Sequence, residues 1–240
     1  MFKKWILLLI IIISTSSIVS AADQQEMTSN EFPTNPLIVD QAYTNGDSNW
    51  LISVNSGYTS LGKSFVLMPT VSYGVMNNLD IILGLKDPNL LQSPSFSIIG
   101  MDIGLKILFL SDDIFALSVK NSFIVLSLPT IFSGKIDSYD FDISLIGSMK
   151  IGESLILHEN IGYDSIDHGI HLTTSGEYMV LDQLAITLTA GTHQFGQGEL
   201  FVMGGAIYAL TNTIYIDLGV SVELKGSDDI DGLLGIAFKL

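Results

Sequence analysis

The stretch "TIYIDLGVSVEL", residues 213–224, alternates apolar side chains with polar or small ones along its whole length. Successive side chains of a β-strand point to opposite faces of the sheet, so this pattern predicts a strand with one apolar and one polar face. The fold depends on what the apolar face contacts. The apolar positions are Ile214, Ile216, Leu218, Val220, Val222 and Leu224.

The same alternation recurs along the chain from residue 49 to the end, with turn residues between the segments. We expect about twelve strands, because each segment is long enough for one strand and the segments follow one another without a helical period. They fall within residues 50–58, 65–75, 79–85, 99–109, 115–123, 139–149, 155–163, 169–180, 184–192, 199–209, 213–224 and 234–240.

The connections between these segments alternate between short and long. Turns such as "MNNL", "LDQ" and "LTNT" suit tight hairpins, whereas "KDPNLLQSP" and "KGSDDIDG" are longer and richer in Gly, Pro, Asp and Ser. An even number of antiparallel strands with short turns at one end is typical of an outer-membrane β-barrel. The apolar face then contacts lipid, and the sheet must close because unpaired edges are costly in hydrocarbon.

The N-terminal stretch "MFKKWILLLIIIISTSSIVSAADQQ" has two lysines, a short apolar run and small residues at a cleavage point. This pattern predicts a secretory signal peptide at residues 1–22. Residues 23–48 are polar and contain prolines, and we interpret them as a periplasmic leader or a plug inside the barrel. Residues 49–240 are predicted to form the barrel in the outer membrane.

The chain is acidic, with 25 Asp and Glu residues against 10 basic ones and a formal net charge of −15. Removal of Lys3 and Lys4 with the signal would take this from −15 to −17. Such a surface excludes nucleic acid as a partner, since that binding depends on neutralising phosphates. Because the chain has no cysteine, its stability must come from strand pairing and burial.

The polar face of the predicted strands carries charged residues, as a wet lumen would. A soluble exported sandwich or lipocalin-like barrel is the competing interpretation, with the apolar face turned inward. The even strand count, the two loop classes and the aromatic residues near strand ends favour the membrane. The candidate lumen-lining residues are Asp80, Asp102, Lys106, Lys120, Asp140, Asp142, Lys150, Glu177 and Asp217.

The C-terminal stretch, residues 198–240, resembles the closing hairpins of the outer-membrane family named after phenol meta-pathway degradation. The resemblance covers a small-residue strand, the turn "ALTN", Asp217 on the polar face, an acidic loop and a Gly-rich last strand. A second similar stretch is "MPTVSYGVMNNLDIILGL", residues 68–85. The resemblance implies a transporter of small hydrophobic compounds. The chain departs from such barrels in ending at Leu240 instead of phenylalanine and in lacking arginine.

We therefore expect a channel or transporter for small solutes, with the outer-membrane lipids, lipopolysaccharide and the barrel-assembly machinery as its other partners. Acidic lumen residues favour neutral or cationic solutes over anions. Apolar residues are also expected on the lumen face, and they indicate either a hydrophobic route or the filling of a plugged lumen. These are Ile98, Leu108, Ile146 and Met179.

Two other functions remain open. A lipid-modifying hydrolase is suggested by "GDSN", residues 46–49, but that motif belongs to a strand-to-helix turn that this pattern does not provide. A structural or adhesive surface barrel is the third option. We predict no enzyme, and no catalytic, cofactor-binding or metal-binding residues.

Overall fold

The computed structural model describes residues 41–59, 64–86, 100–126, 138–165, 169–192, 200–225 and 230–240. All of them belong to the compact unit Phe32–Leu240. The predicted signal peptide and most of the predicted leader lie outside these residues, so both stay predictions. No helix among the described residues is long and apolar enough to span a membrane.

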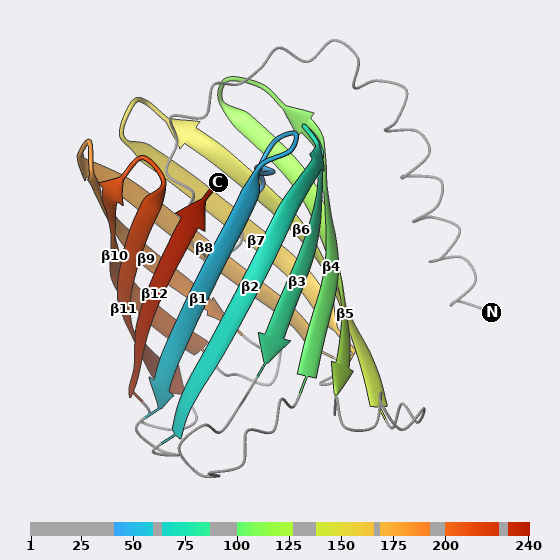
Figure 1. Cartoon of the computed structure of the whole chain (residues 1–240). Helices are drawn as coiled ribbons and strands as arrows, with labels where there is room; N and C mark the ends of the chain where they lie inside the picture. Colours follow the sequence, from blue (N-terminus) through green and yellow to red (C-terminus); the bar gives the residue numbers. More distant parts are fainter. Residues whose placement is uncertain are drawn as a thin grey trace. The chain divides into compact units, whose positions relative to one another are not determined.

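Twelve antiparallel strands form a closed barrel, which confirms the predicted fold class (Figure 1). Each strand pairs with its neighbours in the chain, and β1 pairs with β12 from Leu51↔Lys239 to Thr59↔Asp231. The strands are β1 (Trp50–Thr59), β2 (Ser64–Met76), β3 (Leu79–Lys86), β4 (Gly100–Ser111), β5 (Phe115–Leu126), β6 (Ser138–Ile151), β7 (Leu155–Asp164), β8 (Gly169–Leu181), β9 (Leu184–Thr192), β10 (Leu200–Thr211), β11 (Ile214–Lys225) and β12 (Ile230–Lys239).

The two faces of the wall differ in the way the opening sequence pattern predicts. In β11 the side chain of Leu218 is 55% exposed on the outside, whereas that of Asp217 is 3% exposed on the inside. The same alternation holds in the other strands, where leucine, isoleucine and valine dominate the exposed positions. An outer wall this apolar suits hydrocarbon and is unfavourable in water. The soluble alternative, with its apolar face turned inward, is therefore wrong.

The short connections, residues 77–78, 112–114, 152–154, 182–183 and 212–213, all join consecutive strands at one end of the barrel. We call this end the short-turn rim and the opposite end the long-loop rim. Paired aromatic rings face outward near both rims. The rings of Trp50 and Tyr73 are 4.4 Å apart near the short-turn rim, and those of Phe141 and Tyr163 are 6.0 Å apart near the long-loop rim. Aromatic rings at both ends are typical of membrane interfaces.

Strand β12 begins at Ile230, four residues before the predicted start at Leu234. Ile230 pairs with Val222 of β11, and Asp231 pairs with both neighbouring strands. The acidic and glycine residues of this stretch look like a loop in the sequence. Pairing on both sides extends the strand through them.

Pro69 lies inside β2 without removing a needed hydrogen-bond donor. The N–H of Gly74 donates to the Asn49 carbonyl oxygen on the β1 side. The backbone N–H groups of successive residues in a strand point alternately toward its two neighbours. The backbone nitrogen of Pro69 therefore points toward β3 and not toward β1. The β2–β3 pairs begin one residue later, at Thr70↔Gly84. A central strand therefore accommodates this proline, because the position has no ladder hydrogen bond to lose.

Candidate functional site

The lumen wall holds eight of the nine candidate lining residues at inward-facing positions. The ninth, Asp140, lies in β6, but its side chain is outside the described set. Asp80, Lys106 and Lys120 occupy one row across β3, β4 and β5. Asp142 lies opposite Asp164 near the long-loop rim. The other inward-facing candidates are Asp102, Lys150, Glu177 and Asp217.

A hydrophobic route requires apolar side chains that are exposed to the lumen, and two of the four expected residues are not exposed there. Leu108 and Ile146 are buried in a cluster with Ala42 and Ala116, and Tyr43 packs against it. They are therefore covered by the chain itself. Met179 faces inward at the end of β8, and Ile98 lies outside the described residues.

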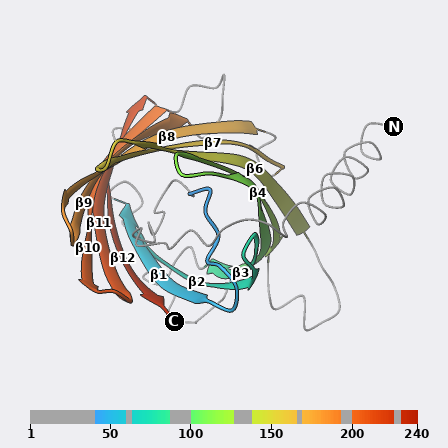
Figure 2. The ribbon, with the colours of Figure 1, turned by 90° about the horizontal axis from the view of Figure 1, so that it is seen from above.

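The segment before β1 lies inside the barrel and forms what we call the lumen strap, residues 41–49 (Figure 2). The backbone N–H of Asn45 donates to both carboxylate oxygens of Asp80, at 3.1 and 3.0 Å. The Asn45 side-chain amide donates to Ser72 Oγ at 2.7 Å. Farther along the wall, the N–H of Ala42 donates to Ser148 Oγ at 2.8 Å. The strap therefore follows the wall from β2 to β6.

A tight reversal joins the strap to β1. Gly46 and Ser48 have positive φ angles of 81° and 61°, and the Ser48 N–H donates to the carbonyl oxygen of Gly74. Only glycine fits at position 74, because a Cβ there would overlap the carbonyl oxygen of Gly46. The strap and the wall thus meet backbone to backbone at this point.

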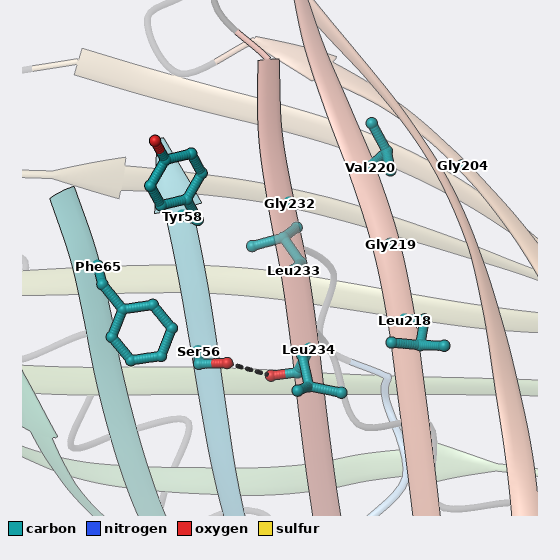
Figure 3. Close-up of a pocket in the computed structure, with 10 residues that line it drawn as sticks. All are labelled: Ser56, Tyr58, Phe65, Gly204, Leu218, Gly219, Val220, Gly232, Leu233 and Leu234. Carbon is teal, nitrogen blue, oxygen red and sulfur yellow. Dashed lines mark hydrogen bonds between the residues drawn. The ribbon is translucent and has the colours of Figure 1, made fainter. Parts of the chain in front are cut away.

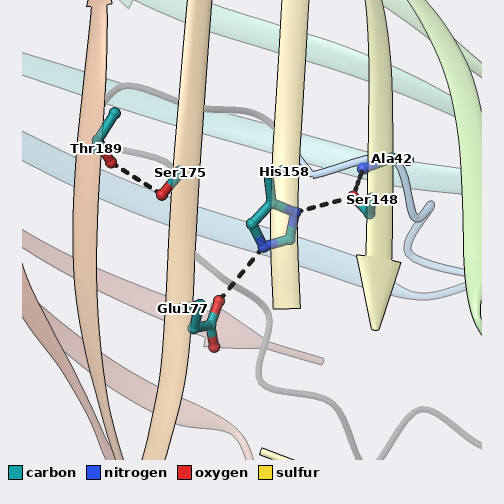
Figure 4. A network of polar contacts seen from close by, with 6 residues as sticks. All are labelled: Ala42, Ser148, His158, Ser175, Glu177 and Thr189. Atoms are coloured by element: carbon teal, nitrogen blue, oxygen red, sulfur yellow. Dashed lines mark hydrogen bonds and ion pairs between the residues drawn. The ribbon is translucent and has the colours of Figure 1, made fainter. Parts of the chain in front are cut away.

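The strap continues into a polar network of the wall (Figure 4). Ser148 Oγ lies 2.9 Å from His158 Nδ1. The same Ser148 Oγ accepts the Ala42 N–H, so this hydroxyl links the strap to the ring. The other ring nitrogen of His158, Nε2, faces Glu177 Oε2 at 3.6 Å. All three side chains are buried, and Ser148 joins this part of the wall to the strap.

A second serine, histidine and carboxylate group lies near the long-loop rim. Ser144 Oγ is 3.3 Å from His171 Nε2, and His171 Nδ1 is 3.8 Å from Asp142 Oδ2. The imidazole crosses Gly162, where a side chain would overlap it. The Ser144 hydroxyl, however, donates to Asp142 Oδ1 at 2.9 Å.

These two groups have the residue types of a hydrolytic triad but a different proton arrangement. An attacking serine must give its proton to histidine. The Ser144 proton points to Asp142 instead, and Ser148 is covered by Ala42 of the strap. The geometry therefore favours structural networks over a hydrolase. The "GDSN" motif forms the reversal into β1, which contains no helix.

On the part of the wall that faces the middle of the strap, the buried carboxylate of Asp217 has fewer hydrogen-bond partners than that of Asp80. Asp217 extends across Gly235 toward Asn55, since a Cβ at Gly235 would overlap atoms of both side chains. Neither Asp217 oxygen accepts a hydrogen bond of ordinary geometry from the described part of the chain. A buried carboxylate with so few well-placed hydrogen-bond donors is costly to keep ionised.

A groove of about 430 Å³ lies on the outer face of this same wall (Figure 3). Small residues, Ser56, Gly204 and Gly232, leave it open between Tyr58 and Leu234. Its lining comes mostly from positions that face outward, so the groove belongs to the lipid side and not to the lumen.

Sequence reasoning missed several polar lumen residues. His158 and His171 were not recognised as inward-facing, although Leu157, Ile170 and Leu172 beside them are apolar residues of the outward face. Asp231 was missed because β12 was predicted to start after it. Among the described residues, no three His, Asp or Glu side chains converge on a possible metal site.

No protein-family model and no curated protein sequence matches the chain. Solved structures resemble it in fold. A KdgM porin has a TM-score of 0.63 at 11% identity, over 78% of this chain and 98% of the porin. The NanC porin has a TM-score of 0.58 at 13% identity, over 79% and 100%. Omp33, an outer-membrane protein of Acinetobacter baumannii, has a TM-score of 0.53 at 9% identity, over 80% and 98%. The chain thus has the fold of these outer-membrane barrels.

Proposed function

We propose that the chain is an outer-membrane channel for small neutral and cationic solutes. One observation carries the proposal: the closed barrel has an apolar outer wall and an inner wall with an acidic excess. Passage through such a barrel is passive, with selectivity set by the width of the lumen and the charge of its lining. The fold shared with KdgM and NanC supports a channel.

The sign of the lining charge supports the choice of solute. Among the described side chains, acidic residues outnumber lysines two to one at inward positions of the strands. A solved KdgM structure is described as a complex with disordered oligogalacturonate. An anion of that kind would meet net repulsion in this lumen. The acidic residues are Asp80, Asp102, Asp142, Asp164, Glu177, Asp217, Glu223 and Asp231, and the lysines are Lys106, Lys120, Lys150 and Lys239.

The test is the reversal potential of the folded protein in a planar bilayer under a KCl gradient. We expect cation selectivity that weakens at high salt, because screening shortens the reach of the lining charges. Asp102→Asn should reduce the selectivity. Glu159→Gln is the matched control, because Glu159 lies on the outer wall and hydrogen-bonds Thr174 there. Anion selectivity of the folded wild type would contradict the proposed solute class.

The hydrophobic solutes implied by the phenol meta-pathway resemblance are the second candidate. The burial of Leu108 and Ile146 beneath the strap counts against an apolar route along that side. Flux of neutral sugars and of aromatic compounds into the same liposomes separates the two candidates. Faster passage of the aromatic compounds would favour the hydrophobic one.

The outer-membrane location, the cleaved signal at residues 1–22 and assembly by the barrel machinery are part of the same proposal. A fractionated cell should give the protein in the outer membrane, with a faster gel band before boiling than after. N-terminal sequencing of that band should start near residue 23. A soluble periplasmic protein without a mobility shift would refute the channel. No enzymatic activity is proposed.

A further inference from the structure

The geometry points to the lumen strap as the size filter of this barrel, an inference that rests on the proposed channel function. The strap is the segment of the described chain that lies within the wall without belonging to it. It therefore narrows any solute path at the short-turn rim.

The strap covers nearly half of the wall. It contacts Ser72 in β2, Asp80 in β3 and Ser148 in β6, and its Ala42 belongs to one buried cluster with Leu108 of β4 and Ala116 of β5. The strap side of the rim thus includes five consecutive strands of the twelve. A solute passing this level must go between the strap and the strands that it leaves uncovered.

The strap is large enough to narrow the lumen substantially. Strands spaced about 4.8 Å apart and tilted by about 40° give a twelve-stranded wall a backbone diameter of about 24 Å. Side chains extend about 5 Å from each side, half the spacing of packed sheets, which leaves about 14 Å. One more layer of about 5 Å reduces the free width to about 9 Å on the strap side. This removes about a third of the cross-section.

The strap is held firmly enough to act as a fixed filter. Its hydrogen bonds reach the wall at both ends and in the middle, and two of them go to the carboxylate of Asp80. The side chain of Thr44 donates to the Asn77 carbonyl oxygen at 2.6 Å, and the Asp47 N–H donates to Asn77 Oδ1 at 3.1 Å. Hydrogen bonds to charged groups are among the stronger ones in proteins.

A pair of glycines provides a matched test. Gly74 and Gly84 both face the lumen, on β2 and β3, but only Gly74 lies against the strap backbone. Gly74→Ala should displace the strap, because the new methyl group overlaps the Gly46 carbonyl oxygen. Gly84→Ala meets its nearest atom, Asp102 Cβ, at an ordinary 3.4 Å and should leave the strap in place.

The measurements are single-channel conductance and the size cut-off for neutral sugars or polyethylene glycols in liposomes, on variants that show the mobility shift of a folded barrel. Gly74→Ala should raise the conductance about 1.5-fold, in line with the lost cross-section, and admit larger solutes. Gly84→Ala should match the wild type. A second variant, lacking residues 41–47, should behave as Gly74→Ala does.

Displacement is checked independently. The chain has no cysteine, so the pair Asn45→Cys and Ser72→Cys should cross-link through a short bifunctional thiol reagent in an otherwise unchanged chain and fail to do so with Gly74→Ala. If the folded variant without residues 41–47 keeps the wild-type conductance and cut-off, the filter is refuted. If neither the wild type nor any variant conducts, the channel function fails instead.

Discussion

Two buried carboxylates that lie four strands apart on the lumen wall differ sharply in their partners. Asp80, on the strap side, is 2% exposed, accepts the Asn45 N–H on both oxygens and lies opposite Lys106. Asp217, on the side without the strap, is 3% exposed, and its oxygens accept no hydrogen bond of ordinary geometry from described residues. The two carboxylates are thus equally buried, but Asp80 has more hydrogen-bond donors to offset the cost of burying its charge. The strap supplies N–H groups that are available as donors, whereas most N–H groups of a strand pair with neighbouring strands.

The largest expected effect is that of removing the strap-side carboxylate. Asp80→Ala deprives the Asn45 N–H of its acceptor and Lys106 of its opposite charge, so the free energy of unfolding should fall by about 2–3 kcal/mol. The measurement is urea unfolding of the folded barrel in detergent micelles, followed by tryptophan fluorescence. Asp217→Ala is the control. If it destabilises the barrel as much as Asp80→Ala, the two walls do not differ as described.

A smaller effect of opposite sign is expected on the other wall. Asp217→Asn replaces a buried charge that has few well-placed donors by a neutral group of the same shape, so the free energy of unfolding should rise by about 1 kcal/mol. The same substitution at position 80 should lower it, because a carboxylate accepts a hydrogen bond more strongly than an amide oxygen. Parallel urea titrations of the two variants give the answer. Stabilisation at both positions would show that the strap does not compensate Asp80.

The smallest effect should come from the turn between β4 and β5, at the edge of the strap side. Asp112 accepts the N–H groups of Ile114 and Phe115 at 2.8 and 2.7 Å, and these bonds lower the pKa of its exposed carboxyl. Tyr43 of the strap has its pKa raised by burial and by the charge of Asp112. The turn and the strap are therefore electrostatically linked.

The sign of the pH effect follows from the lowered pKa of Asp112. Its contribution is complete above the carboxyl pKa of the unfolded chain and is lost as the pH falls through the lower value of the folded state. The urea midpoint of Asp112→Ala should thus lie slightly below that of the wild type at neutral pH, and the two should converge in strong acid. Asp113→Ala, in the same turn, is the control. A difference that persists at all pH values would assign the effect to the turn backbone instead.

Most of the fold could be predicted from the sequence, because the two faces of a barrel wall contact different surroundings. Alternation places a side chain on one face, and short turns locate one rim. The twelve strands and the membrane-facing wall could therefore be predicted. The start of β12 was predicted wrongly at Leu234, since Ile230 and Asp231 are recognised as strand only through their pairing with β11 and β1.

The candidate site was less predictable for a physical reason. Alternation shows that Asp80 and Asp217 share a face, but not which of them lies beneath the strap. The strap itself has no period, and its contacts with Ser72 and Ser148 join residues 27 and 106 positions apart. Leu108 and Ile146 were correctly expected on the lumen face, but their cover by Ala42 depends on that same distant contact.

The junction of the first and last strands has a consequence for how quickly the protein assembles. Trp50 and Leu240 exchange two backbone hydrogen bonds of 2.9 Å, so the seam joins residues from the two ends of the barrel sequence. The other pairs of strands are neighbours in the chain and can form locally as hairpins. Closing a long loop costs entropy before its contacts form, and topologies with distant contacts fold slowly. Zipping of the seam between β1 and β12 should therefore be the last and slowest step of barrel formation.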